Sequence, residues 1–303
     1  MEPLYLNTYK NGLFEEKIER LNKILYNGCQ LCPRRCGTNR SKDLGFCGAK
    51  MRIVIASFGQ HHGEETPISG HKGSGTIFFS NCNLKCVFCQ NYDISIFGSG
   101  YEIDTKGLAG IMVQLQRNGS HNINLVTPTH YVPQIVEAIF LAIGNGLNIP
   151  IVYNCGGYEN LRVIKLLAGI IDIYMPDLKF FSGGFSSKYC NAPDYWQNAA
   201  CAIKEMYNQV GDLKCDNQGV AYRGLLVRHL VMPDLYEDSK KILYYIAEEI
   251  SKDTYVNIMA QYRPEWKAKQ IPELNTYIEQ EKYLELINFA YRLGLNNIDY
   301  IKK

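Results

Sequence analysis

The chain lacks an excess of charge of either sign, and it lacks any long apolar run. Its 303 residues include 32 Lys and Arg against 30 Asp and Glu, a net charge of +2. This balance excludes the strongly basic surface by which proteins hold nucleic acids or anionic membranes through charge alone. The longest apolar stretches have the length of one strand or helix, well below the roughly 20 residues of a membrane span. We therefore expect neither nucleic acid nor a membrane as a partner.

Histidine is scarce, and the sequence shows no secretory signal. Six His residues without a His-rich ligand motif argue against a zinc enzyme. Cysteine, by contrast, is abundant, with eleven residues. Without a secretory signal, these cysteines are expected to be metal ligands and free thiols in a reducing environment rather than disulfides. The sequence therefore predicts a cytoplasmic protein.

Three of the cysteines stand close together. Cys82, Cys86 and Cys89 have the spacing C-x3-C-x2-C and follow a strand-like run. Three thiolates can hold three corners of a four-iron cube, which leaves the fourth iron open to a ligand. A closed zinc site needs four protein ligands, and no fourth lies nearby in the sequence. The spacing favours a [4Fe–4S] cluster with one open position over a zinc knuckle or buried thiols.

A second set of four cysteines precedes this motif. Its members are Cys29, Cys32, Cys36 and Cys47, spaced C-x2-C-x3-C-x10-C. Four thiols at short spacings can close a tetrahedral site with no vacancy, so a metal there would be structural. Structural zinc, an auxiliary iron–sulfur cluster and unmetallated thiols all stay open as interpretations. Arg34, Arg35 and Arg40 would offset the negative charge of four thiolates under either metal interpretation.

Apolar strands and amphipathic helices alternate from residue 76 onward. The predicted strands are 76–79, 123–126, 149–153, 171–175, 224–231 and 255–259, and the predicted helices are 106–118, 131–144, 159–168, 237–250 and 279–293. This alternation favours a parallel sheet that is buried on both faces. We therefore predict an α/β protein whose residues 75–303 form a partial (β/α)6 TIM-like barrel. An N-terminal Cys-rich extension (1–74) with a helix in 1–28 and a strand at 51–58 precedes it.

Two segments do not fit the repeat. Residues 181–223 interrupt the barrel, with a helix near 198–209, and are interpreted either as a substrate lid or as a surface excursion. The loop after residue 58 carries four chemically active residues, His61, His62, Glu64 and Glu65. They are interpreted either as a metal or acid–base cluster or, preferably, as solvated or hydrogen-bonded loop residues.

The strand exits of the predicted barrel carry polar residues. In parallel α/β folds the chemistry sits beyond the carboxyl ends of the strands. Here the exits hold the three clustered cysteines, then 127–130, 154–157 and 176–180, then Arg228 with His229, and finally 261–264. Turns alone also favour Asn, Asp, Gly and Pro. Six reactive exits on one rim nevertheless indicate an active site.

The Cys82, Cys86 and Cys89 motif resembles the signature of the radical S-adenosylmethionine (radical SAM) superfamily. The resemblance implies a partial barrel, and it implies that the methionine amino and carboxylate groups of SAM chelate the open iron. It further implies that an electron from the cluster splits the sulfonium, giving a 5′-deoxyadenosyl radical that abstracts hydrogen. An electron donor such as a flavodoxin or a ferredoxin is the partner that this chemistry requires.

Residues 75–265 resemble more narrowly the pyruvate formate-lyase-activating enzymes. The stretch 175–179, Met-Pro-Asp-Leu-Lys, is similar to that family's strand-four motif. The resemblance implies that Asp177 and Lys179 hold the SAM carboxylate, partly through a monovalent cation. Asn154 and Cys155 stand where the family has Asp and Thr, so this chain lacks one charge that would bind the cation. His229, at the strand-five position, is implied to approach the adenosine end of SAM.

The family's Gly-Gly-Glu-Pro motif, which receives the methionine amino group, is replaced here by Val-Thr-Pro-Thr-His. Thr127, Thr129 and Asn124 are the candidates for that hydrogen bond. Gln90, which follows the last cysteine, and Gln261, at the sixth exit, complete the predicted cofactor-binding set. Together with the early cysteines, 127–131 and 261–264 resemble a branch of uncharacterised activating-enzyme homologues.

Three functions follow as hypotheses. The first is a radical SAM oxidoreductase that abstracts hydrogen from an unidentified substrate. The second is an activating enzyme that installs a glycyl radical on a partner enzyme, which makes that protein the substrate. The third, from another class, is a non-catalytic metal-binding module that binds a partner.

Overall fold

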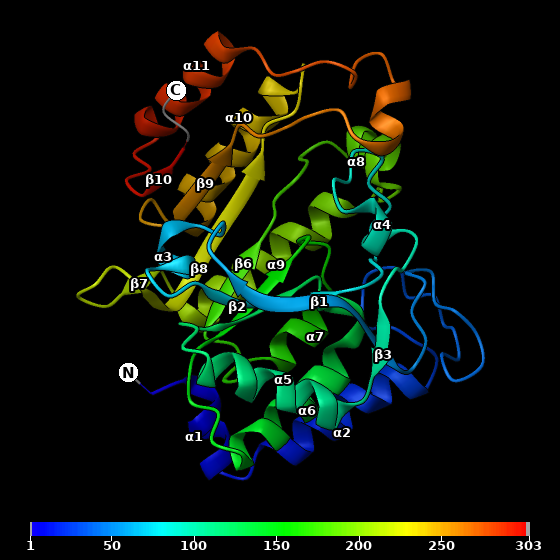
Figure 1. Ribbon diagram of the computed structural model, residues 1–303. Helices are drawn as coiled ribbons and strands as arrows, with labels where there is room; N and C mark the ends of the chain where they lie inside the picture. Colours follow the sequence, from blue (N-terminus) through cyan, green and yellow to red (C-terminus); the bar gives the residue numbers. More distant parts are fainter. Residues whose placement is uncertain (1, 301–303) are drawn as a thin grey trace.

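The computed structural model describes residues 2–300 and is built on one curved sheet with helices along its outer face (Figure 1). Six strands pair in parallel in the order β2, β4, β5, β6, β8 and β9. Their bounds are β2 Ser74–Phe79, β4 Ile123–Val126, β5 Ile151–Cys155, β6 Ile173–Pro176, β8 Ala221–Leu230 and β9 Tyr255–Met259. The predicted partial (β/α)6 barrel is confirmed.

Four further strands in the described part of the chain pair with the six parallel ones or with one another. β1 (Ile53–His61) pairs antiparallel with β2, and β3 (Tyr101–Ile103) pairs antiparallel with β1. β10 (Ile298–Asp299) adds a parallel strand to β9, and β7 (Lys214–Cys215) pairs with the start of β8. Within residues 2–300 no pairing joins β3 to β10, so the barrel stays open.

A helix follows each parallel strand and returns the chain to the start of the next strand. These helices are α5 Thr105–Arg117, α6 Val132–Gly144, α7 Leu161–Leu166, α9 Tyr195–Val210, α10 Tyr236–Tyr245 and α11 Gln280–Arg292. α5 begins where the Asp104 side chain accepts the N–H of Gly107, a normal N-terminal cap. α10 continues into a π-turn, Ile246–Ile250, so the helix predicted at 237–250 is confirmed as two joined pieces.

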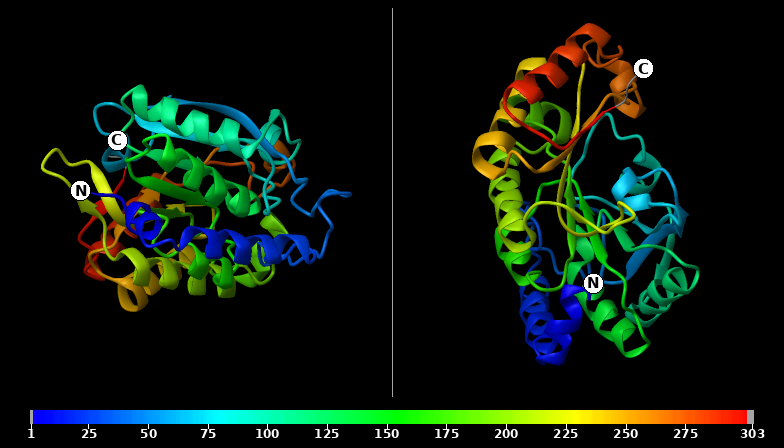
Figure 2. Two further views of the ribbon diagram at one scale, coloured as in Figure 1. Left: turned by 90° about the horizontal axis from the view of Figure 1, so that it is seen from below. Right: turned by 90° about the vertical axis from the view of Figure 1, so that its left-hand side faces the viewer.

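The N-terminal extension shares the barrel's core. α1 (Leu4–Lys10) and α2 (Phe14–Tyr26) replace the single helix expected in 1–28, because Asn11 and Gly12 end the first one. Figure 2 shows this blue pair lying along the green barrel helices, and α2 contacts α6 and α7. Tyr5 and Phe14 belong to the same buried cluster as the outer faces of the strands.

The two faces of the strands differ in polarity, and this difference positions the site. Alternate residues such as Tyr153 and Val227 join the large core beneath the helices. The inner face holds a much smaller apolar cluster, which includes Val152 and Leu226. Side chains alternate between the faces along a strand, so the neighbours of these inner residues, two positions further on, also point inward.

Residues 181–223 contain α8 (Gly183–Cys190), α9 and β7. α9 contacts α7, β6 and β8, which is the place of the crossover helix between β6 and β8. That part of the segment therefore does not lie over the rim. Short elements complete the chain: α3 Thr66–Ser69, α4 Tyr92–Ser95, and the 3-10 turns Thr129–Tyr131 and Trp266–Gln270. None of the helices within residues 2–300 has both the length and the apolar character that crossing a bilayer requires.

Candidate active site

The loop that carries the three clustered cysteines leaves the end of β2 and is fixed by asparagines. Asn81 adopts a left-handed conformation, with φ of 75°, and its N–H donates to the Ile94 carbonyl at 2.8 Å. The Asn83 side chain donates to the Tyr158 carbonyl at 2.6 Å. Asn tolerates left-handed backbone and pairs with main-chain groups, so these two residues shape the loop around the thiols.

All three thiols are free and at least partly shielded from solvent. Burial raises the pKa of Cys82 to about 12 and also raises the pKa of Cys89, whereas the positive charge of Lys179 acts in the opposite direction on both. Within residues 2–300 no three His, Cys, Asp or Glu side chains converge as the ligands of one ion do. In a four-iron cube each thiolate binds a different iron, so three cluster ligands need not meet at one ion. The positive charge of Lys179 nearby stabilises the negative charge of the thiolates. The donor set of Cys82, Cys86 and Cys89 therefore fits a [4Fe–4S] cluster.

An ion network stands at the rim beside this loop. The Asp177 carboxylate accepts from Lys179 Nζ at 2.6 Å, and from Arg228 Nε at 2.9 Å. Arg228 Nη2 also donates to Asn154 Oδ1 at 2.7 Å. Desolvation alone would raise the pKa of Asp177, but Arg228 and Lys179 hold it below its usual value. Sequence reasoning named Asp177, Lys179 and Asn154, and it named Arg228 only as one of the polar exit residues.

Two carboxylates from the loop before β2 also reach the barrel interior. Glu64 Oε2 lies 3.8 Å from Arg228 Nη1, and burial raises the pKa of Glu64. Glu65 Oε1 accepts from Asn257 Nδ2 at 2.8 Å. His61 and His62 stay on the exposed side of the chain, and His61 ends β1 rather than lying in a loop. His61 Nδ1 nevertheless lies 3.7 Å from Glu64 Oε1, so His61 contacts the site through Glu64, while the two Glu residues reach the barrel interior.

The exits of β4 and β5 are tightly packed. Thr127 has φ of 60°, a strained conformation for a β-branched residue, and its N–H donates to the Asn154 carbonyl at 2.8 Å. Asn124 pairs with Val152 and so faces inward, where neither atom of its side-chain amide has a partner among the described residues. Gly157 has φ of +78°, and a Cβ there would meet the Asp177 carbonyl at 2.2 Å. Glycine alone fits that position.

Two of the predicted cofactor-binding residues are turned to the outer face. Thr129 Oγ1 donates to Glu159 Oε1 at 2.5 Å, and Tyr153 donates to the other oxygen of Glu159 at 3.1 Å. Cys155 lies next to the same carboxylate, whose pKa is raised to about 7 by burial. The hydroxyl of Thr129 is thus already committed to a buried network with Glu159 and Tyr153.

His229 also does not join the predicted site. It follows Arg228 on β8 and so faces the helices. One ring nitrogen lies 2.7 Å from the Leu178 carbonyl and the other 2.8 Å from Ser239 Oγ. Both nitrogens therefore have structural partners, and Arg228 faces inward in its place. Period-two alternation separates the two residues in the sequence, but it does not say which face is inner.

Gln90 and Gln261 contact each other where the cluster loop meets the end of β9. Gln90 Nε2 donates to the Gln261 carbonyl at 3.4 Å, and both residues are exposed. This contact joins the residue after Cys89 to the exit of β9. Two of the predicted cofactor-binding residues are therefore neighbours on the rim.

The four-cysteine loop packs directly on the cluster loop. Arg34 donates to the carbonyls of Asn83, at 3.0 Å, and Cys190, at 3.2 Å. Cys29, Cys32 and Cys47 are buried and Cys36 is exposed. In the described part of the chain no three of these thiols meet at one point. The three interpretations of this set stay predictions.

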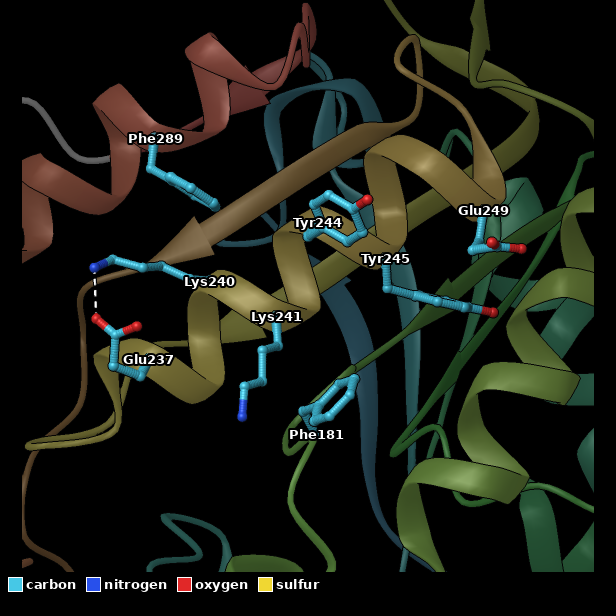
Figure 3. A pocket seen from close by; sticks show the side chains of 8 residues that line it. All are labelled: Phe181, Glu237, Lys240, Lys241, Tyr244, Tyr245, Glu249 and Phe289. Atoms are coloured by element: carbon cyan, nitrogen blue, oxygen red, sulfur yellow. Dashed lines mark hydrogen bonds and ion pairs between the residues drawn. The ribbon is translucent and has the colours of Figure 1, made fainter.

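A hollow of about 510 Å³ lies elsewhere, on the outside of the barrel. Figure 3 shows it along α10, between Phe181 and Phe289, with Lys240, Lys241 and Glu237 at its edge. None of the predicted site residues lines it. It is not the candidate active site.

Comparison with known proteins decides the family. The model of the radical SAM superfamily matches residues 76–209. The uncharacterised protein MJ0674 of Methanocaldococcus jannaschii is 33% identical, over 96% of this chain and 82% of that protein. The chain belongs to the radical SAM superfamily. A second uncharacterised protein of this organism, MJ0808, is 21% identical over 87% of this chain and 77% of its own length.

Membership of the radical SAM superfamily implies a [4Fe–4S] cluster and SAM as cofactors, and it implies radical chemistry. Among solved structures, a domain of a pyruvate-formate lyase-activating enzyme from Bacteroides vulgatus superposes on 65% of this chain and 91% of that one. The TM-score is 0.39 and the identity 10%, so this superposition carries no argument about function.

Proposed function

We propose that this radical SAM protein is an oxidoreductase that cleaves SAM reductively and abstracts hydrogen from a substrate that is not yet identified. Cys82, Cys86 and Cys89 would hold the [4Fe–4S] cluster. When bound and reduced, the cluster supplies the electron that breaks the sulfonium bond of SAM and so creates a radical able to take hydrogen. The observation that carries the proposal is the position of Lys179, tied to Asp177 beside the three free thiols.

The rim residues would orient SAM. Its amino-acid end carries a carboxylate, and Lys179 and Arg228 are cations of the rim, each with about one sixth of its side chain exposed. Asp177 and Asn154 fix both cations through the hydrogen bonds described above. Asn124 has an unpartnered amide among the described residues and Thr127 has a strained backbone, and both suit a polar ligand that displaces water. A flavodoxin or ferredoxin would supply the electron.

Anaerobic reconstitution tests this proposal. The protein is loaded with ferrous iron and sulfide, reduced with dithionite and supplied with SAM, and 5′-deoxyadenosine and methionine are measured. We expect Cys82→Ala, Cys86→Ala and Cys89→Ala each to abolish cleavage while the circular dichroism of the barrel is retained. Cys201→Ala, which removes an exposed cysteine, is the matched control. Turnover in any of the three cluster variants would contradict the assignment, and a loaded wild type that never cleaves SAM would favour a non-catalytic binding module.

Activation of a glycyl radical enzyme is a second candidate. One specific observation favours it: α9 packs between β6 and β8, so this part of residues 181–223 does not cover the rim. A rim that α9 leaves uncovered suits a protein loop as substrate, whereas a lid over a small molecule excludes water. Electron paramagnetic resonance of the reduced protein with SAM and a glycyl radical enzyme from the same cell separates the two. A stable glycine-centred doublet supports activation, and 5′-deoxyadenosine without that signal supports another substrate.

A further inference from the structure

A fourth thiol lies against the cluster loop. Cys190, the last residue of α8, is fully buried, and its Sγ is 3.2 Å from Cys86 Sγ. Cys190 is 104 residues from Cys86 in the chain, so it is not part of the C-x3-C-x2-C motif. Among residues 2–300 no thiol is paired with Cys82 or Cys89 in this way: Leu84 N–H donates to Cys82 Sγ, and Cys89 Sγ lies 3.1 Å from Ser95 Oγ.

The backbone holds the two sulfurs together. Lys85 N–H donates to the Cys190 carbonyl at 3.3 Å, and Val87 N–H donates to the Tyr189 carbonyl at 2.9 Å. These bonds lie on either side of Cys86, and Arg34 also donates to the Cys190 carbonyl at 3.2 Å. The two sulfurs, 3.2 Å apart, need to approach by only about 1.2 Å to reach the roughly 2.0 Å bond length of a disulfide. Small rotations of two side chains would therefore be enough to join the sulfurs.

We propose that Cys86 and Cys190 form a reversible disulfide whenever the chain is without its cluster, and that this bond withholds the Cys86 thiol from iron until it is reduced. The inference rests on the proposed function, because it takes Cys86 as a cluster ligand. Disulfides in a reducing compartment are characteristically transient and regulatory. A bond of this kind would protect a ligand thiol from irreversible oxidation and would link cluster assembly to the redox state of the cell.

Hydrogen peroxide is the oxidant we invoke. One thiolate attacks the peroxide, breaking the O–O bond and giving a sulfenic acid and, after protonation, water. The second thiol then attacks the sulfenic sulfur, forming the S–S bond and releasing a second water. Two thiols thus lose two electrons and two protons, and one peroxide becomes two waters. A dithiol reductant reverses the bond through a mixed disulfide.

Disulfide mapping tests the bond directly. Cluster-free full-length protein is treated with peroxide, denatured, alkylated without reduction, digested and analysed by mass spectrometry. We expect a peptide pair joined through Cys86 and Cys190, and its disappearance in Cys190→Ser. Cys201→Ser, which removes an exposed thiol, should retain the pair. Full alkylation of Cys86 after peroxide treatment would overturn the proposal.

Iron uptake tests the consequence. Peroxide-treated wild type should take up most of its iron only after dithiothreitol, whereas treated Cys190→Ser and Cys190→Ala should load equally with or without it. The same dependence in the variants as in wild type would refute a role for Cys190. Loss of iron from anaerobically loaded variants would also refute it, because Cys190 would then be a ligand. Neither measurement involves SAM, so a chain that failed to cleave SAM would leave the disulfide result standing.

Discussion

The Asp177 ion network permits a quantitative prediction. Asp177→Asn removes a carboxylate that accepts from Lys179 at 2.6 Å and from Arg228 at 2.9 Å, in a place where the Asp177 side chain is 16% exposed. Removing one partner of a buried ion pair costs about 3–5 kcal/mol, because the remaining charge is left unpaired. Glu64, 3.8 Å from Arg228, offsets part of this cost. We therefore expect the free energy of unfolding to fall by about 3 kcal/mol.

A double-mutant cycle with Lys179→Met isolates the pair. Once Asp177 is neutral, the Lys179 ammonium is left in a repulsive contact, and deleting the ammonium removes that repulsion. The double variant should therefore lose about 1–2 kcal/mol less unfolding free energy than the two single variants lose in sum. Urea unfolding followed by circular dichroism measures all four proteins. The exposed pair Lys204 and Glu249, 3.0 Å apart, is the control, and its coupling should stay below about 1 kcal/mol. Additive losses within about 0.5 kcal/mol for the buried pair would refute this account of the rim.

Three further predictions follow from the same structure. Burial raises the pKa of Glu159 to about 7, above the unfolded value near 4.3, so the stability that the protonated Glu159 provides is lost as pH rises through 7. Relative to Glu159→Gln, the wild-type free energy of unfolding should fall by about 2–3 kcal/mol between pH 5 and pH 8 in urea titrations, and a pH-independent difference would contradict this prediction. Gly157→Ala should lower the free energy of unfolding by about 3 kcal/mol or more, because the new Cβ clashes with the Asp177 carbonyl. Gly119→Ala, which shares the positive φ but meets no atom within 4 Å, should cost only about 1–2 kcal/mol, and equal losses would be inconsistent with the clash. His229→Ala should lower the free energy of unfolding by about 1–3 kcal/mol, because two hydrogen bonds are lost. The affinity for SAM, measured by calorimetry, should stay unchanged, and a large loss of affinity would support the contact between His229 and SAM that the sequence predicted.

The sequence by itself determined the features that depend on local pattern. The C-x3-C-x2-C spacing indicated the cluster loop, because three thiols within eight residues need no tertiary contact to be recognised together. Alternating apolar strands and amphipathic helices predicted the six parallel units, since burial on both faces leaves its signature in every strand. Asp177 and Lys179 were named because the stretch 175–179 resembles a family motif, which is a contiguous run that sequence alone can reveal, and the structure pairs the two side chains.

Only the tertiary structure decided which side of each strand faces inward. A period of two separates Arg228 from His229 but is symmetric between the faces, so only the structure shows that Arg228 points inward while both His229 nitrogens have partners on the helix side. The same holds for contacts between distant segments. Glu64 reaches Arg228, and Cys190 lies against Cys86, only because the chain folds back across the barrel. Contacts of such long sequence separation leave no periodic trace, because the path of the backbone, rather than any local preference, brings their partners together.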